Sequence, residues 1–208
     1  MCSSDLSYVL VTPYSIRKSR TGAILSRLIS RTALDLVAAR MFTPSRELVE
    51  TYAATFVREG STTQREVQEL LKQYVLQNFA SSESHRPRLL MLVFKGEDAV
   101  EKIRSAVGHI LHDDPAGQTI RDTFGDYVTD AQGKVTYFEP AAFAPQDAAS
   151  AKADLLLWAS HSYAEGGVLD SAIDFPAGTK PEKTLVLIKP DNFRVRSEEH
   201  TSELQSRV

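Results

Sequence analysis

The sequence lacks several of the features that would assign it to a class at once. It has one cysteine in 208 residues, which excludes a disulfide framework and a cysteine-rich zinc site. No apolar run approaches the roughly 18 residues that a membrane-spanning helix requires, and no signal peptide is visible. No glycine-rich phosphate loop of either common type is present. We therefore expect a cytoplasmic protein with no membrane partner.

An excess of charge of one sign is also absent. The 24 Lys and Arg residues stand against 27 Asp and Glu residues, so the net charge is −3. This balance argues against a nucleic-acid partner, but it leaves nucleotides open because they need only a few well-placed cations. The 42% hydrophobic and 25% charged content is ordinary for a globular protein, and the length suggests one domain with a short remainder.

Both ends of the sequence resemble translated sequencing adaptor. Residues 196–206 read RSEEHTSELQS, which is similar to the in-frame translation of a common adaptor. Residues 1–6, MCSSDL, resemble the same adaptor read on the opposite strand. We expect 1–6 and 196–208 to lie outside the natural domain, so that Cys2 and His200 carry no function.

Apolar patterning predicts a sheet covered by helices. Strands are expected at 8–12, 34–42, 89–94 and 184–189, a hairpin at 124–138, and a polar loop at 15–21. Helices are expected from Gly22, near Pro44, from a Thr63–Glu66 capping box, around Ile103, and from Asp147 to about Trp158. The order fits an α+β (α/β sandwich) fold with a ferredoxin-like βαββαβ core, in which helices cover an antiparallel sheet.

A short sequence near the start of the chain recurs near its end. Residues 9–17 recur as residues 186–194 at an offset of 177 positions, with Val, Leu, Pro and Arg identical in both copies. We expect one module over 7–175, a linker over 176–183, and the first strand of a second, truncated copy over 184–195.

The second copy carries the first of several motifs that point to a known family. Its LIKPD run, with Lys189 at the centre, resembles the opening motif of nucleoside diphosphate kinases. In the first copy, residues 22–25 resemble that family's glycine and first helix, and residues 150–158 resemble the helix that follows its catalytic loop. The likeness covers nearly all of residues 7–195.

The resemblance also implies a set of nucleotide-binding residues. Tyr52 sits where the family has a tyrosine that contacts the nucleotide, and Arg104 resembles a phosphate-contacting arginine. Thr119 and Arg121 belong to a Thr-Ile-Arg motif like the family's, and the 17 positions from Arg104 to Arg121 equal the family spacing. By themselves, Tyr52 also fits a half-buried helix residue and the arginines fit surface ion pairs.

The resemblance further implies a reaction and its partners. A family histidine takes the γ-phosphate of one nucleoside triphosphate and passes it to a diphosphate, which is covalent catalysis through a nitrogen nucleophile. The implied cofactor is Mg²⁺ with ATP or another nucleoside triphosphate. The implied partners are nucleotides, further copies in a homo-oligomer, or the missing second copy.

The first copy departs from the family pattern where the chemistry occurs. Phe143 falls at the position of the catalytic histidine, and Pro140 stands where an asparagine is expected. Thr12 replaces the motif lysine, Tyr14 replaces the aspartate, and the hairpin after Arg121 is longer than the family's interval. We therefore expect no catalytic residue and no metal ligand in this copy, with catalysis in the second copy.

Other interpretations remain open. The domain could keep nucleotide binding through Tyr52, Arg104 and Arg121 without chemistry, or it could be an active phosphotransferase that uses His109 or His112. Those two histidines precede an Asp-Asp pair and could ligate a metal, or they could simply end a helix. His161 lacks the nucleophile elbow of a hydrolase. Residues 17–20 are a solvated basic loop or an anion site.

Overall fold

A computed structural model gives the architecture of the chain. It describes residues 5–56, 62–82, 86–110, 117–132, 135–162 and 178, and only the backbone of 62–64. The strands are β1 (Asp5–Val11), β2 (Asp35–Phe42), β3 (Leu89–Gly96), β4 (Asp126–Thr129), β5 (Val135–Glu139) and β6 (Ala142–Phe143). The helices are α1 (Pro13–Arg17), α2 (Thr21–Thr32), α3 (Arg46–Ala54), α4 (Thr62–Asn78), α5 (Ala99–Val107), α6 (Ile120–Phe124) and α7 (Ala148–Ser160).

The main sheet has four strands in the order β2-β3-β1-β6. Strand β3 runs antiparallel to both β1 and β2, so it lies between two strands that are parallel to each other. A two-residue pairing joins β6 to the far side of β1, and β4 and β5 form a separate hairpin. This arrangement is the ferredoxin-like α+β fold predicted from the order of elements.

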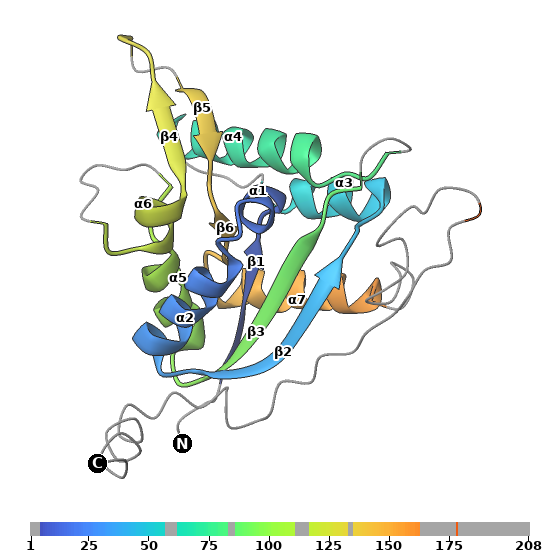
Figure 1. Ribbon diagram of the computed structural model, residues 1–208, viewed down its shortest axis with the longest axis vertical. Helices are drawn as coiled ribbons and strands as arrows, with labels where there is room; N and C mark the ends of the chain where they lie inside the picture. The colour runs from blue at the N-terminus through green and yellow to red at the C-terminus, as the bar shows by residue number, and fades with distance from the viewer. Residues whose placement is uncertain are drawn as a thin grey trace. The chain divides into compact units, whose positions relative to one another are not determined.

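The two faces of the sheet are covered by different helices (Figure 1). Alternate residues of β1 point to opposite faces. Tyr8 and Leu10 contribute to the core under α3, α4 and α7, whereas Val9 and Val11 contribute to the core under α2 and α5. Strand β3 is central, which confirms the interpretation of its apolar run as a strand buried on both faces.

The prediction for the segment after β1 was wrong. A loop was expected at 15–21, but Pro13–Arg17 form the short helix α1. The Thr12 side chain caps it by accepting a hydrogen bond from the Ser15 backbone, and Pro13 occupies the first turn, where its missing N–H costs nothing. Helix α3 likewise begins later than expected, because Ser45 is its cap and Pro44 lies before it.

The other predicted helices and the hairpin are present. Helix α4 buries Leu71, Tyr74 and Val75 from the predicted stripe. It begins at Thr62, so the prediction of Thr63 as its cap was wrong: Thr63 lies inside the first turn. Strands β4 and β5 form the predicted hairpin, and Asp147 caps α7 as expected. In the described part of the chain, no helix has the length and apolarity required to cross a bilayer.

The predicted ends and second copy stay predictions. The chain divides into two units, residues 1–174 and 175–208, and every element named above belongs to the first. Apart from Gly178, residues 163–208 lie outside the described residues, and so do residues 1–4. Asp5 and Leu6, assigned to the adaptor from sequence, pair in β1 with Gly96 and Lys95.

The cap of α7 gives a test of this fold. The Asp147 carboxylate accepts from the Ser150 backbone N–H at 2.7 Å. We expect Asp147→Ala to lower the free energy of unfolding by about 1 kcal/mol, because the first turn loses an acceptor. Urea denaturation measures this, with Asp147→Asn as the control that keeps an acceptor. Equal stability of Asp147→Ala and wild type would contradict the assignment.

Candidate functional site

The candidate site lies where the end of β1 meets the segment between β5 and β6. The backbone N–H of Thr12 and the hydroxyl of Ser15 both donate to the carbonyl of Ala141, at 3.1 and 2.9 Å. Ala141 has a φ of 59°, and the Ala142 N–H donates to the Pro140 carbonyl at 2.6 Å. A positive φ is strained for a residue other than glycine, so contacts with α1 hold this tight turn in place.

The turn directs Phe143, the residue predicted to fall at the family's histidine position, into the core. Its side chain is 1% exposed. Three rings surround it, with centroids 5.4 Å away for Phe79, 5.7 Å for Phe56 and 5.8 Å for Tyr74. Two of these contacts are edge-to-face, the geometry that aromatic rings favour. The position therefore contributes to packing and offers no nitrogen lone pair.

A carboxylate occupies the region beside the turn. Glu139 is 6% exposed, and its Oε1 accepts from the Tyr74 hydroxyl and, at 3.3 Å, from the Thr12 hydroxyl. Burial raises the pKa of Glu139, and the hydrogen bonds from Tyr74 and Thr12 oppose that rise. Thr12 is the residue predicted to stand in place of the motif lysine, and the structure places its hydroxyl and that of Tyr74 on the Glu139 carboxylate.

Tyr52 lies in the core. It is 1% exposed, and its ring stacks edge-on against Phe56 and Trp158. Its hydroxyl lies 3.1 Å from the Tyr8 hydroxyl, which donates to Asp154 at 2.7 Å. Burial raises the pKa of Tyr52 and of Tyr8, so both phenols are neutral. The nucleotide contact expected for Tyr52 would require its hydroxyl to leave this network.

Arg121 is buried and faces the turn. It is 8% exposed and donates through Nη1 to the Gly108 carbonyl and through Nη2 to the Ala142 carbonyl, the latter at 3.0 Å. Burial lowers its pKa to about 10, so the guanidinium stays charged at neutral pH. Its Nε has no hydrogen-bond partner among the described residues.

Thr119, in the same region, is the N-cap of α6. Its hydroxyl and the Asp122 carboxylate form a capping box at the start of α6. Gly108 has a φ of 91°, and a Cβ there would lie 2.3 Å from the Thr119 hydroxyl oxygen. Only glycine fits this approach, which brings the Gly108 carbonyl to Arg121.

Arg104 acts on the other side of Phe143. It is exposed on α5, and its Nη1 donates to the Gln146 carbonyl at 3.2 Å. Arg121 bonds the backbone before Phe143 and Arg104 bonds it after. The structure therefore brings both predicted arginines to the segment that carries Phe143, and each of them bonds a carbonyl there.

Of the remaining predicted residues, the two histidines that the structure describes lie apart from this site. His109 is exposed, and His161 bonds the Leu157 carbonyl at the end of α7. His112 and Lys189 lie outside the described residues. Within the ranges that the structure describes, no three His, Cys, Asp or Glu side chains are grouped as metal ligands.

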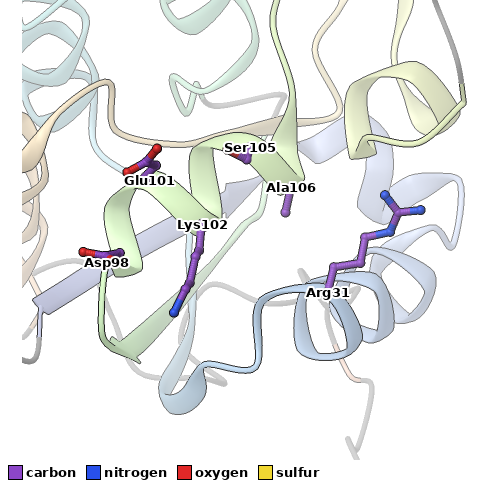
Figure 2. A pocket seen from close by; sticks show the side chains of 6 residues that line it. All are labelled: Arg31, Asp98, Glu101, Lys102, Ser105 and Ala106. Carbon is purple, nitrogen blue, oxygen red and sulfur yellow. The ribbon is translucent and has the colours of Figure 1, made fainter.

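A shallow depression of about 610 Å³ lies elsewhere, between α2 and α5 (Figure 2). Its lining carries two cations and two carboxylates, so it has no preference for ligands of one charge. It shares no residue with the site around Phe143. The lining residues are Arg31, Asp98, Glu101, Lys102, Ser105 and Ala106.

Sequence reasoning missed the two groups that close the site, Tyr74 and Glu139. Tyr74 was predicted only as part of an apolar stripe. A buried tyrosine needs a partner for its hydroxyl, so its place in that stripe was a usable signal for a polar contact. Nothing local in the sequence identifies Glu139 as that partner, since the two residues are 65 positions apart.

The sheet order and its helical layers define a ferredoxin-like α+β domain. The family model described as nucleoside diphosphate kinase matches residues 5–158. The chain therefore belongs to the nucleoside diphosphate kinase family. No curated protein matches the chain.

Solved structures of similar fold include several enzymes of this family. The nucleoside diphosphate kinase of Aquifex aeolicus is 22% identical with a TM-score of 0.54, covering 74% of this chain and 94% of that one. The Pyrobaculum aerophilum NDP kinase is 20% identical with a TM-score of 0.56, covering 75% and 96%. The Borrelia burgdorferi enzyme with bound vanadate and ADP is 19% identical with a TM-score of 0.54, covering 74% and 86%.

Burial of Glu139 predicts a pH dependence of stability. A carboxyl with a raised folded-state pKa holds its proton more tightly in the folded than in the unfolded state. Its contribution to stability is therefore complete below the unfolded pKa, about 4.3, and is lost as pH rises through the folded pKa. We expect the free energy of unfolding of wild type, relative to Glu139→Gln, to fall as pH rises from about 4.

Urea unfolding of both proteins between acidic and neutral pH measures this difference. The exposed Glu97→Gln variant controls for loss of a surface carboxylate. If the free energy of unfolding of wild type relative to Glu139→Gln stayed constant or rose with pH, burial would not raise the pKa of Glu139.

Proposed function

We propose that this domain is a non-catalytic member of the nucleoside diphosphate kinase family that serves in packing or assembly. The observation that carries the proposal is the burial of Phe143, which is 1% exposed beneath Phe56, Tyr74 and Phe79. A phenyl ring cannot accept a phosphoryl group, and this one is enclosed by the protein's own side chains.

The charges around the turn support the same proposal. Transfer of a γ-phosphate requires cations placed against the phosphate oxygens. Here Thr12 stands in place of the motif lysine, and its hydroxyl bonds the Glu139 carboxylate. An anionic ligand at this place would meet a second anion at close range, which is unfavourable in a partly buried site.

The hydrogen bonds of the two arginines also support a non-catalytic role. Arg121 bonds the carbonyls of Gly108 and Ala142, and Arg104 bonds that of Gln146. A phosphate bound by Nη1 or Nη2 of Arg121 would have to replace bonds that hold the backbone around Phe143. In the proposed function the two guanidinium groups brace this segment.

The repeat of residues 9–17 at 186–194 supports a place in a tandem protein. The second copy keeps Lys189 and Asp191 at positions where the first has Thr12 and Tyr14. In this proposal the second copy carries the phosphoryl relay, and the first copy packs against it or against another protein.

We expect no phosphotransfer from the isolated chain. Incubation with γ-labelled ATP and GDP should give neither labelled GTP nor an acid-labile phosphoprotein, and Phe143→His should remain unlabelled because the position is enclosed. An active nucleoside diphosphate kinase serves as the positive control. Labelling of wild type would overturn the proposal, and His109→Ala and His112→Ala would then locate the nucleophile.

Retained nucleotide binding is a second candidate, favoured by the buried Nε of Arg121 that has no partner among the described residues. Mg²⁺ would then enter with the nucleotide's phosphates. We expect calorimetric titration with ADP and MgCl₂ at millimolar concentration to give no heat of binding. Binding that is lost in Arg121→Gln would establish the second candidate instead.

A further inference from the structure

The β4–β5 hairpin has an inner and an outer face. Directly paired residues share one face of an antiparallel pair, and here Tyr127 pairs with Phe138 and Val128 with Tyr137. The Phe138 ring lies 5.7 Å from that of Tyr74 on α4 and 6.1 Å from that of Tyr127. Because this pair packs toward α4, Val128 and Tyr137 lie on the opposite, outer face.

The outer face is apolar and open to solvent. Val128 is 51% exposed and Tyr137 is 46% exposed. Figure 1 shows the hairpin of β4 and β5 extending beyond the four-stranded sheet. Single exposed apolar residues are ordinary on protein surfaces. This pair differs because a neighbouring aromatic residue extends it along the surface.

Tyr14 of α1 continues the outer face. Its hydroxyl donates to Asp126 Oδ2 at 3.3 Å, and the nearby Tyr14 phenol is one of the groups that raise the pKa of Tyr137, after burial. Lys18 Nζ lies 5.8 Å and Arg20 Cζ lies 5.2 Å from the centre of the Tyr14 ring, which are cation–π distances.

The charge of this surface is mainly positive. Arg17 and Lys18 are exposed, and Arg20 is half-buried beside Tyr14. The exposed acid among them is Asp126, since Glu139 on the same face of the hairpin is buried. We define the hairpin strip as Tyr14, Arg17, Lys18, Arg20, Val128 and Tyr137.

We infer that the hairpin strip is a docking surface for an acidic protein segment that carries at least one apolar side chain. Val128 and Tyr137 would receive the apolar side chain, and the three cations would pair with the acidic ones. Tyrosine and arginine are the residues that interfaces most often use as anchors. The inference rests on the assembly role proposed above and gives that role a partner chemistry.

Charge complementarity favours a short acidic segment over a long polyanion. The chain as a whole has no excess of positive charge, at −3, so a nucleic acid extending past the hairpin strip would gain no further charge attraction. A protein segment confined to the strip would meet only its local positive charge, and an apolar anchor would match Val128 and Tyr137.

A random peptide library displayed on phage, selected against the immobilised full chain, tests this inference. We expect the selected peptides to be enriched in Asp and Glu together with Leu, Ile or Phe. Synthetic copies should bind Val128→Ser/Tyr137→Ser and Arg17→Gln/Lys18→Gln at least about tenfold more weakly than wild type, as for loss of an interface anchor. Added salt should weaken binding to wild type.

Two matched variants serve as controls. Leu156→Ser changes another exposed apolar residue, 63% exposed on α7, and Arg46→Gln/Lys72→Gln removes two cations from α3 and α4. Both should bind the selected peptides within about twofold of wild type, because they lie outside the strip. Thermal unfolding confirms that every variant is folded.

Four results would overturn the inference. They are no enrichment of acidic peptides, equal binding by the strip variants, tighter binding of oligothymidylate than of the peptides, and a self-association in sedimentation that Val128→Ser/Tyr137→Ser abolishes. The last two would assign the strip to nucleic acid or to a second copy. Phosphotransfer by wild type would overturn the proposed inactivity separately, since peptide binding is measured without nucleotide.

Discussion

The tight turn at Pro140–Ala142 is the constraint on which the rest of the site depends. A left-handed conformation costs a residue such as Ala141 about 1–2 kcal/mol. Two hydrogen bonds to its carbonyl, from Thr12 and Ser15, contribute about 0.5–1.5 kcal/mol each, and burial of the Phe143 ring contributes about 1.5–3 kcal/mol. The strained turn is thus stable because it delivers an aromatic side chain to the core. A solvated polar residue at position 143 would not contribute this burial energy, so less would offset the strain at Ala141.

The polar groups next to the turn are bonded within the chain itself. Glu139 accepts from Tyr74 and Thr12, and Arg121 donates to backbone carbonyls on two segments. A buried charge is tolerated only when such bonds replace water. A ligand that took Nη2 of Arg121 would leave the Ala142 carbonyl without its guanidinium partner. Closure of the site and stability of the fold are therefore coupled through the same bonds.

The fold could be predicted from the sequence further than the site could. The central strand, the α4 stripe, the hairpin and the Asp147 cap all depend on patterns within about a dozen residues, and the structure contains each of them. Helix α1 was missed because a basic, polar run hides a five-residue helix that depends on the Thr12 cap. The pairing of Tyr74 with Glu139 and of Tyr8 with Asp154 joins residues 65 and 146 positions apart. Only the packing of the sheet and helices brings such partners together, so no local pattern predicts them.

The β4–β5 hairpin connects the closed site with the proposed docking surface. On its inner face, Phe138 packs against the ring of Tyr74, whose hydroxyl bonds the Glu139 carboxylate at the end of β5. On its outer face, Val128 and Tyr137 are exposed beside Tyr14. Because side chains alternate along a strand, a hairpin that packs Tyr127 and Phe138 toward α4 presents Val128 and Tyr137 on its other face, and Glu139 at the buried end of that face enters the site. The hairpin therefore links the packing around Tyr74 and Glu139 to the exposed surface on which the proposed docking depends.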